Sequence, residues 1–512
     1  MDDKFQIREW INRLKFFSIN PMEKIAVYGT GDGAKTICNV LKEMGLFENV
    51  IKIIDRDESA KIGSDEFGRN ICRLKDCYLD VDTIIVGAFK YHAIIRERLE
   101  NFCINNTDSK FRIIDLFSHN TQMEELAYIH YIEKEIMKEP SQDFVKFNNT
   151  TYTYIKGDTR VIAWYLPQYH EMEINNKLWG KGFTEWTNTT RAFPLYVGHY
   201  QPHIPYDVGY YNLNNAETFA RQIELAHHYG IYGFSFYYYW FSGKRFMEKP
   251  LDIFLEHVEL DINFCITWAN ENWTTLWDGG QNEIVYRQEI ENGDAYRFID
   301  DLVPVISDYR YITIDGKPLI VIYRGNIFDK KTMATLLYDM RKRAKYHGFK
   351  DLYILITNAG NFDDTVDDLG ADALVEFPPH GMNHIDVFRP QGYINPYFVG
   401  KIYNTNRFIA EKCYMMKHKE RKYYRAALTS WDNTARKARS GAQIYHGLSP
   451  ETFKQWLWDI VTESKKIHSG EHDMVFVNSW NEWGEGSHLE PDMKYGYAYL
   501  DVVKEVVENT RV

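Results

Sequence analysis

Two glutamates three residues apart stand in the segment VNSWNEWGEGSHLEP, residues 477–491, which overlaps the end of the apolar run MVFV. Breaking a glycosidic bond takes one carboxylic acid that protonates the leaving oxygen and a second carboxylate that acts as nucleophile or base. Glu485 lies close to Trp483, and desolvation there would raise the pKa of its carboxyl, as a proton donor requires. Glu482, at the expected strand end, supplies the second carboxylate. The alternative interpretation is that these acids form ordinary ion pairs or cap the following helix.

Eight short apolar segments, most of them separated by stretches with helical periodicity, must position this pair. They are RVIAWYLPQYH, GIYGFSFYYYW, INFCITWANENW, PLIVIYRGN, DLYILITN, ADALVEFPPH, YYRAALTSWDN and MVFVNSWNEW. Eight strand–helix units over residues 159–512 predict an α/β fold, a (β/α)8 TIM barrel with long loops.

Polar and aromatic side chains follow these segments, and the carboxyl ends of barrel strands form the face that carries active sites. On that basis we expect substrate contacts from twelve residues: Asn481, Trp483, Tyr165, His170, Glu185, Trp186, Trp240, Asn270, Glu271, Trp273, Glu376 and Trp431. Trp277, in a loop, is a further candidate of the same kind. Aromatic runs inside strands are more often core than ligand platform, which favours the rings at strand ends. The dispersed histidines form no HExxH-like array, so we expect no metal site.

Residues 1–118 alternate strands and helices, which predicts a small Rossmann-like parallel α/β domain before the barrel. Gly29, Gly31 and Ala34 occupy the positions of a G-x-G-x-x-[G/A] turn, and Asp55 ends the next strand. Such a turn lets backbone N–H groups approach a phosphate, while the acid binds a ribose hydroxyl. The pattern predicts a nucleotide or sugar-nucleotide site. The alternative is a structural or docking module, because the domain is about half the size of a full dinucleotide fold.

Residues 119–158 are expected to form a connector, a helix over 121–139 that Pro140 ends and then a polar linker. The chain carries a net charge of −12, so no basic surface is predicted for nucleic acid or anionic lipid. It shows neither a signal peptide nor a run of the ~18 apolar residues that a membrane helix needs, which predicts a cytoplasmic protein. The sequence indicates no oligomeric state.

Four segments together resemble the WbsX-type family of bacterial surface-polysaccharide gene clusters, which is similar to glycoside hydrolase family 99. They are VIAWYLPQYHEMEINNKLWGKGFTEWTN, YYYWFSGKR, TWANENWT and NSWNEWGEGSHLEP. The resemblance implies a TIM barrel and a retaining reaction without a covalent glycosyl-enzyme. One glutamate deprotonates the 2-hydroxyl of the sugar, which attacks C1 to form a 1,2-anhydro sugar. Carried over by motif position, Glu482 is that base, Glu485 the general acid/base and Asn481 a hydroxyl contact.

The predicted function is a retaining enzyme that cleaves or transfers an α-glycosidic bond in bacterial O-antigen or capsule metabolism. Its barrel chemistry requires no cofactor, and its partner is an oligo- or polysaccharide. Two features depart from the simple hydrolases: the chain shows no export signal, and it carries the Rossmann-like domain. The main alternative is therefore a glycosyltransferase that uses a sugar nucleotide held partly by the first domain. A glycan-binding barrel without turnover and an NAD-dependent oxidoreductase are the remaining alternatives.

Overall fold

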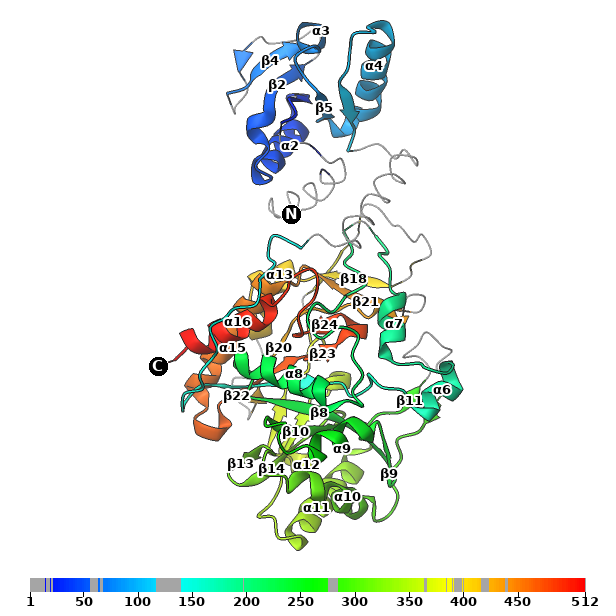
Figure 1. Cartoon of the computed structure of the whole chain (residues 1–512), viewed down its shortest axis with the longest axis vertical. Helices are drawn as coiled ribbons and strands as arrows, with labels where there is room; N and C mark the ends of the chain where they lie inside the picture. The colour runs from blue at the N-terminus through cyan, green and yellow to red at the C-terminus, as the bar shows by residue number, and fades with distance from the viewer. Residues whose placement is uncertain are drawn as a thin grey trace. The chain divides into compact units, whose positions relative to one another are not determined.

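The chain divides into two compact units, Met1–Met137 and Lys138–Val512, described here from a computed structural model (Figure 1). The structure describes residues 14, 19, 22–55, 63–64, 68–116, 140–196, 198–274, 284–362, 366–383, 385–388, 390, 398, 400–415, 423–437 and 441–511. The helix predicted over 121–139 and Trp277 lie outside these residues. The rest of the predicted connector, 140–158, is hydrogen-bonded to the second unit, for example from the Val145 N–H to the Tyr495 carbonyl at 3.0 Å.

The first unit is a parallel α/β sheet, as predicted. Its strands are β1 (Ile25–Tyr28), β2 (Val50–Asp55), β3 (Gly63–Ser64), β4 (Asn70–Arg73), β5 (Thr83–Val86) and β6 (Arg112–Ile114). Its helices are α2 (Asp32–Glu43), α3 (Leu74–Cys77) and α4 (His92–Asn105), with 3-10 turns η1 (Phe47–Asn49) and η2 (Phe89–Tyr91). The strand order is β3-β4-β2-β1-β5-β6, and every pair except β3–β4 is parallel. The chain thus winds outward in both directions from β1, as in doubly wound folds.

Alternation along β1 explains why both faces of this sheet are covered. Ile25 and Val27 pack in one apolar cluster with residues of α2, whereas Ala26 and Tyr28 pack in another with residues of α4. Side chains of a strand alternate between faces, so a continuously apolar strand is buried on both sides. This two-sided burial is typical of a central parallel strand.

The second unit is a barrel of eight parallel strands, which confirms the predicted fold class. The strands are β7 (Arg160–Tyr165), β8 (Gly233–Phe241), β10 (Asn263–Trp268), β14 (Lys317–Ile322), β15 (Tyr353–Thr357), β16 (Ala373–Val375), β19 (Tyr423–Tyr424) with β20 (Ala426–Leu428), and β22 (Met474–Asn478). Only Arg425 separates β19 from β20, so these two form one interrupted strand. Because β19 pairs with β16 and β20 pairs with β22, while β22 pairs with β7, the barrel closes.

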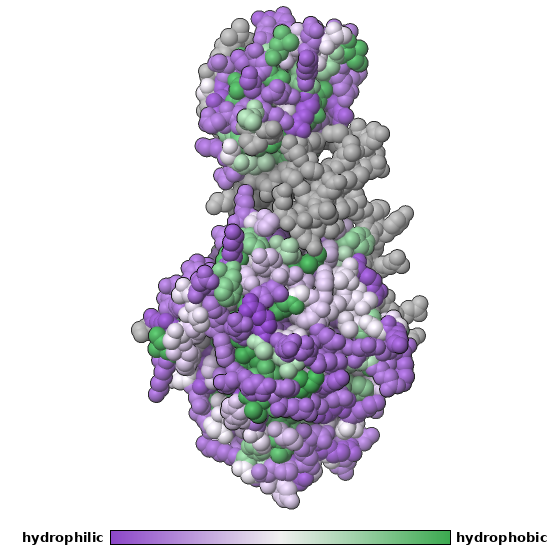
Figure 2. All heavy atoms as spheres, in the orientation of Figure 1, coloured by the Kyte–Doolittle hydropathy of each residue, from purple (hydrophilic) through white to green (hydrophobic). Residues whose placement is uncertain are grey.

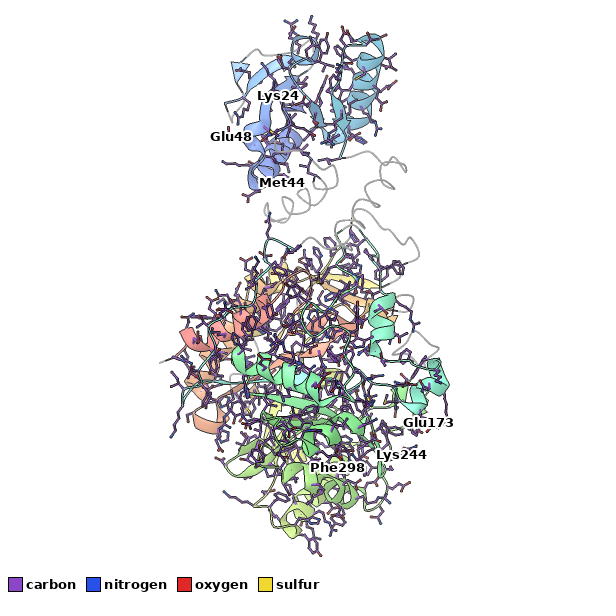
Figure 3. The ribbon with its side chains drawn as sticks, viewed as in Figure 1. Lys24, Met44, Glu48, Glu173, Lys244 and Phe298 are labelled. Carbon is purple, nitrogen blue, oxygen red and sulfur yellow. The ribbon has the colours of Figure 1, made fainter. Side chains whose placement is uncertain are left out.

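Helices surround the strands in Figure 1, and three of them begin at a side-chain cap. They are α8 (Ala216–His228), α9 (Glu248–Glu256), α10 (Asp294–Ile306), α11 (Lys330–Tyr346), α12 (Val366–Leu369), α13 (Asn406–Ala410), α15 (Pro450–Ile467) and α16 (Ala498–Asn509). Asn215 caps α8, Asp329 caps α11 and Ser449 caps α15, each accepting a backbone N–H of the first turn. Phe298 of α10 is fully buried against the strands, while Glu173 and Lys244 lie at the outer edge of the unit (Figure 3).

Short elements fill the loops between strands and helices. They are α6 (Glu173–Trp179), α7 (Glu185–Arg191), α14 (Thr434–Lys437), β9 (Lys244–Phe246), β11 (Trp273–Thr274), β12 (Ile284–Tyr286), β13 (Thr313–Ile314), β17 (Asp386–Val387), β18 (Lys401–Asn404), β21 (Gln443–His446), β23 (Asn481–Glu482), β24 (Ser487–His488), η5 (Ala359–Asn361), η6 (Cys413–Met415), η7 (Gly470–His472) and η8 (Trp483–Glu485).

Figure 2 shows a face that is mostly hydrophilic, with hydrophobic residues scattered over it. Among the helices described, none is long and apolar enough to cross a bilayer.

Candidate active site

A buried arginine gathers three carboxylates at the carboxyl end of the barrel. Arg436 of α14 contacts Glu185 Oε1 through Nε at 2.6 Å and Glu482 Oε2 through Nη2 at 2.8 Å. Its third nitrogen, Nη1, lies 2.8 Å from Glu485 Oε1. The side chain of Arg436 is 2% exposed, and those of the glutamates are 2%, 5% and 16% exposed in the same order. The two predicted catalytic acids therefore share one cation with a third acid from α7.

Close backbone packing brings the acids together. A Cβ atom on Gly484, in η8, would lie 2.0 Å from the Glu185 carboxylate, so a larger residue there would force the Glu185–Arg436 ion pair to shift. Gly486 has a φ of 62°, a conformation that favours glycine, and it ends η8. The Asp432 N–H donates to the Glu485 carbonyl at 2.7 Å, which ties this turn to the end of the interrupted strand. Gly484, between the two glutamates, thus permits the close approach of α7.

Burial sets the charge state of the pair. It raises the pKa of Glu482 to about 8 and raises that of Glu485, although Arg436 acts in the opposite direction on both. Glu271, which follows β10, also has a raised pKa. Burial raises this pKa to about 7, while Arg324 acts in the opposite direction. Three carboxylates around one guanidinium leave an excess of negative charge, which a proton relieves. The site is therefore poised to hold and transfer a proton near neutral pH.

Three tyrosines face these acids, and none was among the predicted contacts. Tyr237 and Tyr239 of β8 and Tyr323, after β14, are partly exposed, and burial raises the pKa of each well above its usual range. The negative charge of Glu482 adds to that rise in all three. They therefore stay neutral and present hydroxyl groups, the kind of partner that sugar hydroxyls bind.

Strand alternation explains why Tyr165 and Trp240 lie elsewhere. The hydroxyl of Tyr165 donates to Gln222 of α8 at 2.7 Å, and the indole N–H of Trp240 donates to Asp301 of α10 at 2.8 Å. Both side chains point toward the surrounding helices, whereas the residues on either side of each along the strand point into the barrel. Their neighbours Trp164 and Tyr239, not these two, face the interior.

The tryptophans of the motif, Trp480 and Trp483, are hydrogen-bonded to the carboxylate of Glu490. Its two carboxylate oxygens accept hydrogen bonds from the Trp480 and Trp483 indoles at 3.1 and 2.7 Å. They also accept from the Gln222 amide at 2.6 Å and the Tyr211 hydroxyl at 2.9 Å. Burial raises the pKa of Glu490 to about 7, while these four donors lower it. The predicted contact Trp483 is itself fully buried and supports the site from behind.

Asn481 and Asn270, two of the predicted substrate contacts, use their side-chain amides for hydrogen bonds within the protein. The side chain of Asn481 accepts from the Leu166 N–H at 2.7 Å and donates to the Leu166 carbonyl at 3.0 Å. Asn270 does the same with Arg324, at 2.7 Å to its N–H and 2.9 Å to its carbonyl. Each asparagine thus joins the ends of two barrel strands. The structure gives them a bracing role around the site.

The remaining aromatic candidates lie at several places on the carboxyl face. Trp186 is 8% exposed and donates its indole N–H to the Tyr211 carbonyl at 2.7 Å, with its ring centroid 5.8 Å from that of Trp483. Trp431 is also 8% exposed, and among the described residues its indole nitrogen has no hydrogen-bond partner. Trp273 packs edge-on against Phe246 at 5.5 Å in a separate small cluster. Trp186 is the one that packs beside the acid pair.

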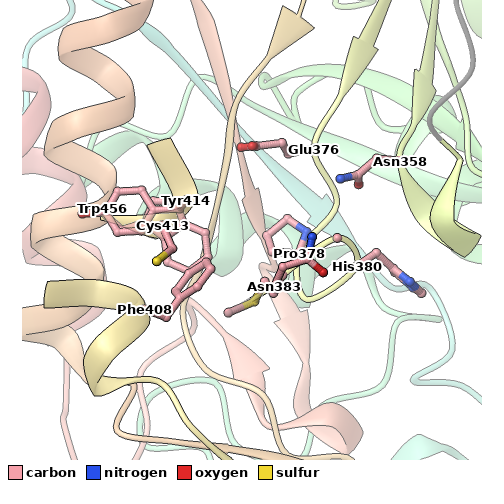
Figure 4. A pocket seen from close by; sticks show the side chains of 11 residues that line it. Asn358, Glu376, Pro378, His380, Asn383, Phe408, Cys413, Tyr414 and Trp456 are labelled. Atoms are coloured by element: carbon pink, nitrogen blue, oxygen red, sulfur yellow. The ribbon is translucent and has the colours of Figure 1, made fainter. Parts of the chain in front are cut away.

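A cavity of about 190 Å³ lies between the end of β16 and the helices α13 and α15, and the acid pair does not line it (Figure 4). Glu376 and His380 line it, with Tyr414 and Trp456 on the opposite wall. Glu376 accepts from Arg425 at 3.0 Å and from the Ala426 N–H at 3.0 Å, so it braces the interrupted strand. His380 Nε2 lies 3.2 Å from the hydroxyl of Tyr323, one of the tyrosines that face the acids.

Burial lowers the pKa of His380 to about 4 and does the same for His170. His170 has its Nδ1 2.8 Å from the Pro167 carbonyl, and a carbonyl only accepts, so Nδ1 carries the proton. Both imidazoles are therefore neutral near pH 7 and suit hydrogen bonding to hydroxyl groups.

The glycine turn of the first unit, around Gly29 and Gly31, leaves free space beside Gly31. Gly29 has a φ of 125° and donates its N–H to the Ile54 carbonyl at 2.7 Å, while Gly31 directly precedes α2. A Cβ on Gly31 would meet no atom within 4 Å. Asp55 accepts a hydrogen bond from the Thr30 hydroxyl at 3.3 Å, and Ala34 packs under the turn against Gly87. The four predicted cofactor-binding residues are thus together at the carboxyl end of β1 and β2.

Arg436 is the site residue that the sequence did not reveal. It lies in the segment NTARKARS, which reads as an exposed basic run. Its contacts join it to residues 46 and 251 positions away along the chain. The only local signal is its position after the last residues of the seventh predicted strand, where polar groups of the carboxyl face gather.

Comparison with known proteins places the barrel in a family. The family model described as "Glycosyltransferase WbsX" matches residues 161–503. The chain belongs to the WbsX family. Two relatives named WxcX, from two strains of Xanthomonas campestris pv. campestris, are 33% identical over 347 residues. That alignment covers 68% of this chain and 49% of each relative, so the chain spans about half the length of these relatives.

Two solved structures align with this WbsX protein. A "Glycoside hydrolase-like protein" aligns with a TM-score of 0.42 at 15% identity, covering 71% of this chain and 98% of that chain. The GH99 endo-alpha-mannosidase from Bacteroides thetaiotaomicron aligns with a TM-score of 0.42 at 12% identity, covering 69% of this chain and 97% of that one.

Proposed function

We propose that this WbsX protein is an enzyme that acts on glycans, cleaving or transferring an α-glycosidic bond with retention of configuration. The proposal rests on one observation: Glu482, which is buried, and Glu485, which is partly buried, both contact the guanidinium of Arg436 and have raised pKa values. Because they contact neighbouring nitrogens of Arg436, the two carboxyl groups can reach the same sugar ring.

In the proposed reaction Glu482 takes the proton of the sugar 2-hydroxyl, whose oxygen attacks C1. The bond from C1 to the leaving oxygen breaks, and Glu485 gives that oxygen its proton. In the second half Glu485 takes a proton from the incoming hydroxyl, which attacks C1 and opens the 1,2-anhydro ring. The 2-oxygen recovers its proton from Glu482, so both glutamates return to their starting states. With a pKa of about 8, Glu482 is ionised chiefly above neutrality, so we expect turnover to rise as the pH approaches 8.

Whether the reaction is hydrolysis or transfer depends on which hydroxyl group attacks C1 in the second half. Water gives hydrolysis, whereas a sugar hydroxyl gives transfer, and the family description favours the second. A sugar nucleotide would serve as donor in that case, with the turn around Gly31 as its nucleotide site. We place the reaction in bacterial O-antigen or capsule metabolism, on the cytoplasmic side.

The test is turnover of two substrate panels by the full chain, followed by mass spectrometry. One panel holds α-linked oligosaccharides, and the other holds sugar nucleotides with glycan acceptors. We expect Glu485→Gln to lower turnover by about 10²–10⁴-fold, the usual contribution of a general acid. Glu463→Gln is the matched control, because Glu463 also pairs with a buried arginine, Arg425, at 2.5 Å but lies outside the site.

Cleavage of an oligosaccharide would establish a glycosidase, and turnover only with a sugar nucleotide and an acceptor would establish a transferase. Equal losses in Glu485→Gln and Glu463→Gln would remove the acid role from Glu485. Glycan binding without turnover in either panel would contradict the proposal and favour a glycan-binding barrel.

A further inference from the structure

Behind the acid pair, two histidines and an aspartate meet in the protein interior. Each of His203, His488 and Asp492 offers a ligand atom, and these atoms lie within 4.8 Å of one another. His203 Nδ1 is 2.9 Å from His488 Nε2, which is 3.7 Å from Asp492 Oδ2. The three residues are 5%, 1% and 1% exposed. Neutral imidazole nitrogens and a carboxylate oxygen are the ligand set of many transition-metal sites.

Hydrogen bonds outside the cluster aim these atoms inward. His488 Nδ1 lies 2.9 Å from the Glu490 carbonyl, which only accepts, so Nδ1 carries the proton and Nε2 presents its lone pair. Asp492 Oδ1 accepts from the Lys494 and Tyr495 N–H groups at 2.9 and 2.6 Å, which leaves Oδ2 turned to the histidines. Such outer bonds fix the tautomer and orientation of metal ligands.

Backbone pairing brings His203 to the same place. The Tyr206 N–H donates to the Pro491 carbonyl at 2.8 Å, and the Met493 N–H donates to the Ile204 carbonyl at 2.9 Å. The loop that carries His203 thus runs antiparallel to the segment that carries Asp492. The positions of the ligands are set by main-chain hydrogen bonds rather than by flexible side chains.

The free side of the Asp492 carboxylate has one polar neighbour besides the histidines. Asp492 Oδ2 is buried 3.7 Å from His488 Nε2, and the Tyr200 hydroxyl is its hydrogen-bonding neighbour. A carboxylate oxygen has two lone pairs, so Oδ2 can accept a cation as well as the Tyr200 hydroxyl. The Lys494 ammonium lies over the Tyr200 ring, 4.4 Å from its centre.

We propose that His203, His488 and Asp492 bind a divalent transition-metal ion of the zinc class. An ion about 2.1 Å from each ligand atom, the usual distance for zinc, would see about 90° between the nitrogens and about 120° between His488 and Asp492. The angle between the nitrogens is narrower than the tetrahedral angle of zinc sites, so the two imidazoles must move slightly apart from their 2.9 Å separation when the ion binds. The Tyr200 hydroxyl or a water molecule is the fourth ligand. The site is buried, so the ion's role is structural.

The ion would hold the segment that carries the acids. His488 stacks on Trp483 with ring centres 3.8 Å apart, and it pairs with Asn481 in the β23–β24 ribbon. Fixing His488 to His203 and Asp492 therefore fixes the turn between Glu482 and Glu485 from behind. The proposal does not depend on which reaction the barrel carries out.

The test is metal content of the full chain after exposure to Zn²⁺ and exhaustive dialysis, measured by inductively coupled plasma mass spectrometry. We expect about one equivalent of zinc in the natural protein. His203→Gln and Asp492→Asn should each lower the retained zinc at least about tenfold. His228→Gln is the matched control, because His228 is buried and its ring nitrogens contact Thr151 and Asn148 outside the cluster.

Zinc retained by the control but not by the two ligand variants supports the site. No zinc in the natural protein, or equal retention in all variants, overturns it and leaves a direct His203–His488 hydrogen bond. If the ligand variants do not fold, X-ray absorption of the zinc-loaded natural protein decides. Imidazole nitrogen and oxygen at about 2.0–2.2 Å support the site, and a first shell without imidazole overturns it. None of these readouts uses glycan turnover, so failure of either proposal is recognisable separately.

Discussion

The glycine turn of the first unit and the mouth of the barrel both match short motifs, yet they differ in physical state. Around Gly31 the surface is open, and Asp55 is only partly buried. Around Arg436 four charged groups are largely removed from water, and Glu482 and Glu485 keep raised pKa values despite that cation. Burying charge opposes folding, so a chain that does so at a barrel mouth indicates chemistry there. An open glycine turn carries no such indication by itself.

The largest effect is expected from Arg436→Met, because it leaves three buried carboxylates without their cation. We expect a loss of about 3–5 kcal/mol in the free energy of unfolding of the barrel. Tryptophan fluorescence reports this unfolding selectively, since only Trp10 of the 13 tryptophans precedes residue 138.

Arg343→Met is the control for that loss. Arg343 pairs with Asp300 at 2.6 Å near the surface, with its side chain 29% exposed, so its loss should cost about 0–1 kcal/mol. Equal losses in the two variants would mean that the charge cluster at the barrel mouth is no more demanding than a surface ion pair.

Glu490→Gln comes next, because it tests a carboxylate that is buried among neutral donors. Gln keeps one acceptor oxygen but turns an NH₂ group toward two of the four donors that Glu490 now satisfies. We expect a loss of about 1–3 kcal/mol in barrel stability, measured by chemical denaturation. A neutral result would show that the tryptophans of the motif do not depend on this carboxylate.

Glu482→Gln should stabilise the barrel at high pH while it abolishes turnover. The pKa of Glu482 is raised from 4.5 to about 8, so its favourable contribution is complete below 4.5 and is lost as the pH rises through 8. Gln stays neutral, and we expect a gain of about 0.5–2 kcal/mol at pH 8 and little change at pH 5. The measurement is thermal unfolding at both pH values. A loss at pH 8 would contradict the raised pKa.

The barrel could be predicted because each strand is a short apolar run that ends in polar residues. Even the seventh strand, interrupted at Arg425, kept that pattern. The acid pair was visible because Glu482 and Glu485 belong to one local motif. Arg436 was not, because its contacts depend on how α14 packs against α7 and η8.

The aromatic residues show a second limit of sequence reasoning. Trp240 and Tyr239 are adjacent in a run of aromatic residues, and only the strand's direction in the barrel decides which one faces the acids. Trp483 looked like a platform for sugar, but the Glu490 carboxylate and the His488 ring cover it. Burial of this kind is set by elements far away in the chain.

The smallest effect on stability is expected from Gly31→Ala. Gly484→Ala is the contrasting variant at the barrel mouth. At Gly31, φ is −89° and a Cβ meets nothing, so the free energy of unfolding should change by no more than about 0.5 kcal/mol. At Gly484 the same atom would lie 2.0 Å from the Glu185 carboxylate, so the barrel must shift, and its melting temperature should fall clearly. Calorimetry of both variants compares the regions directly. A large loss in Gly31→Ala would mean that the glycine turn is as tightly constrained as the barrel mouth. An unchanged stability, combined with loss of any thermal shift by sugar nucleotides, would instead assign that turn to ligand binding.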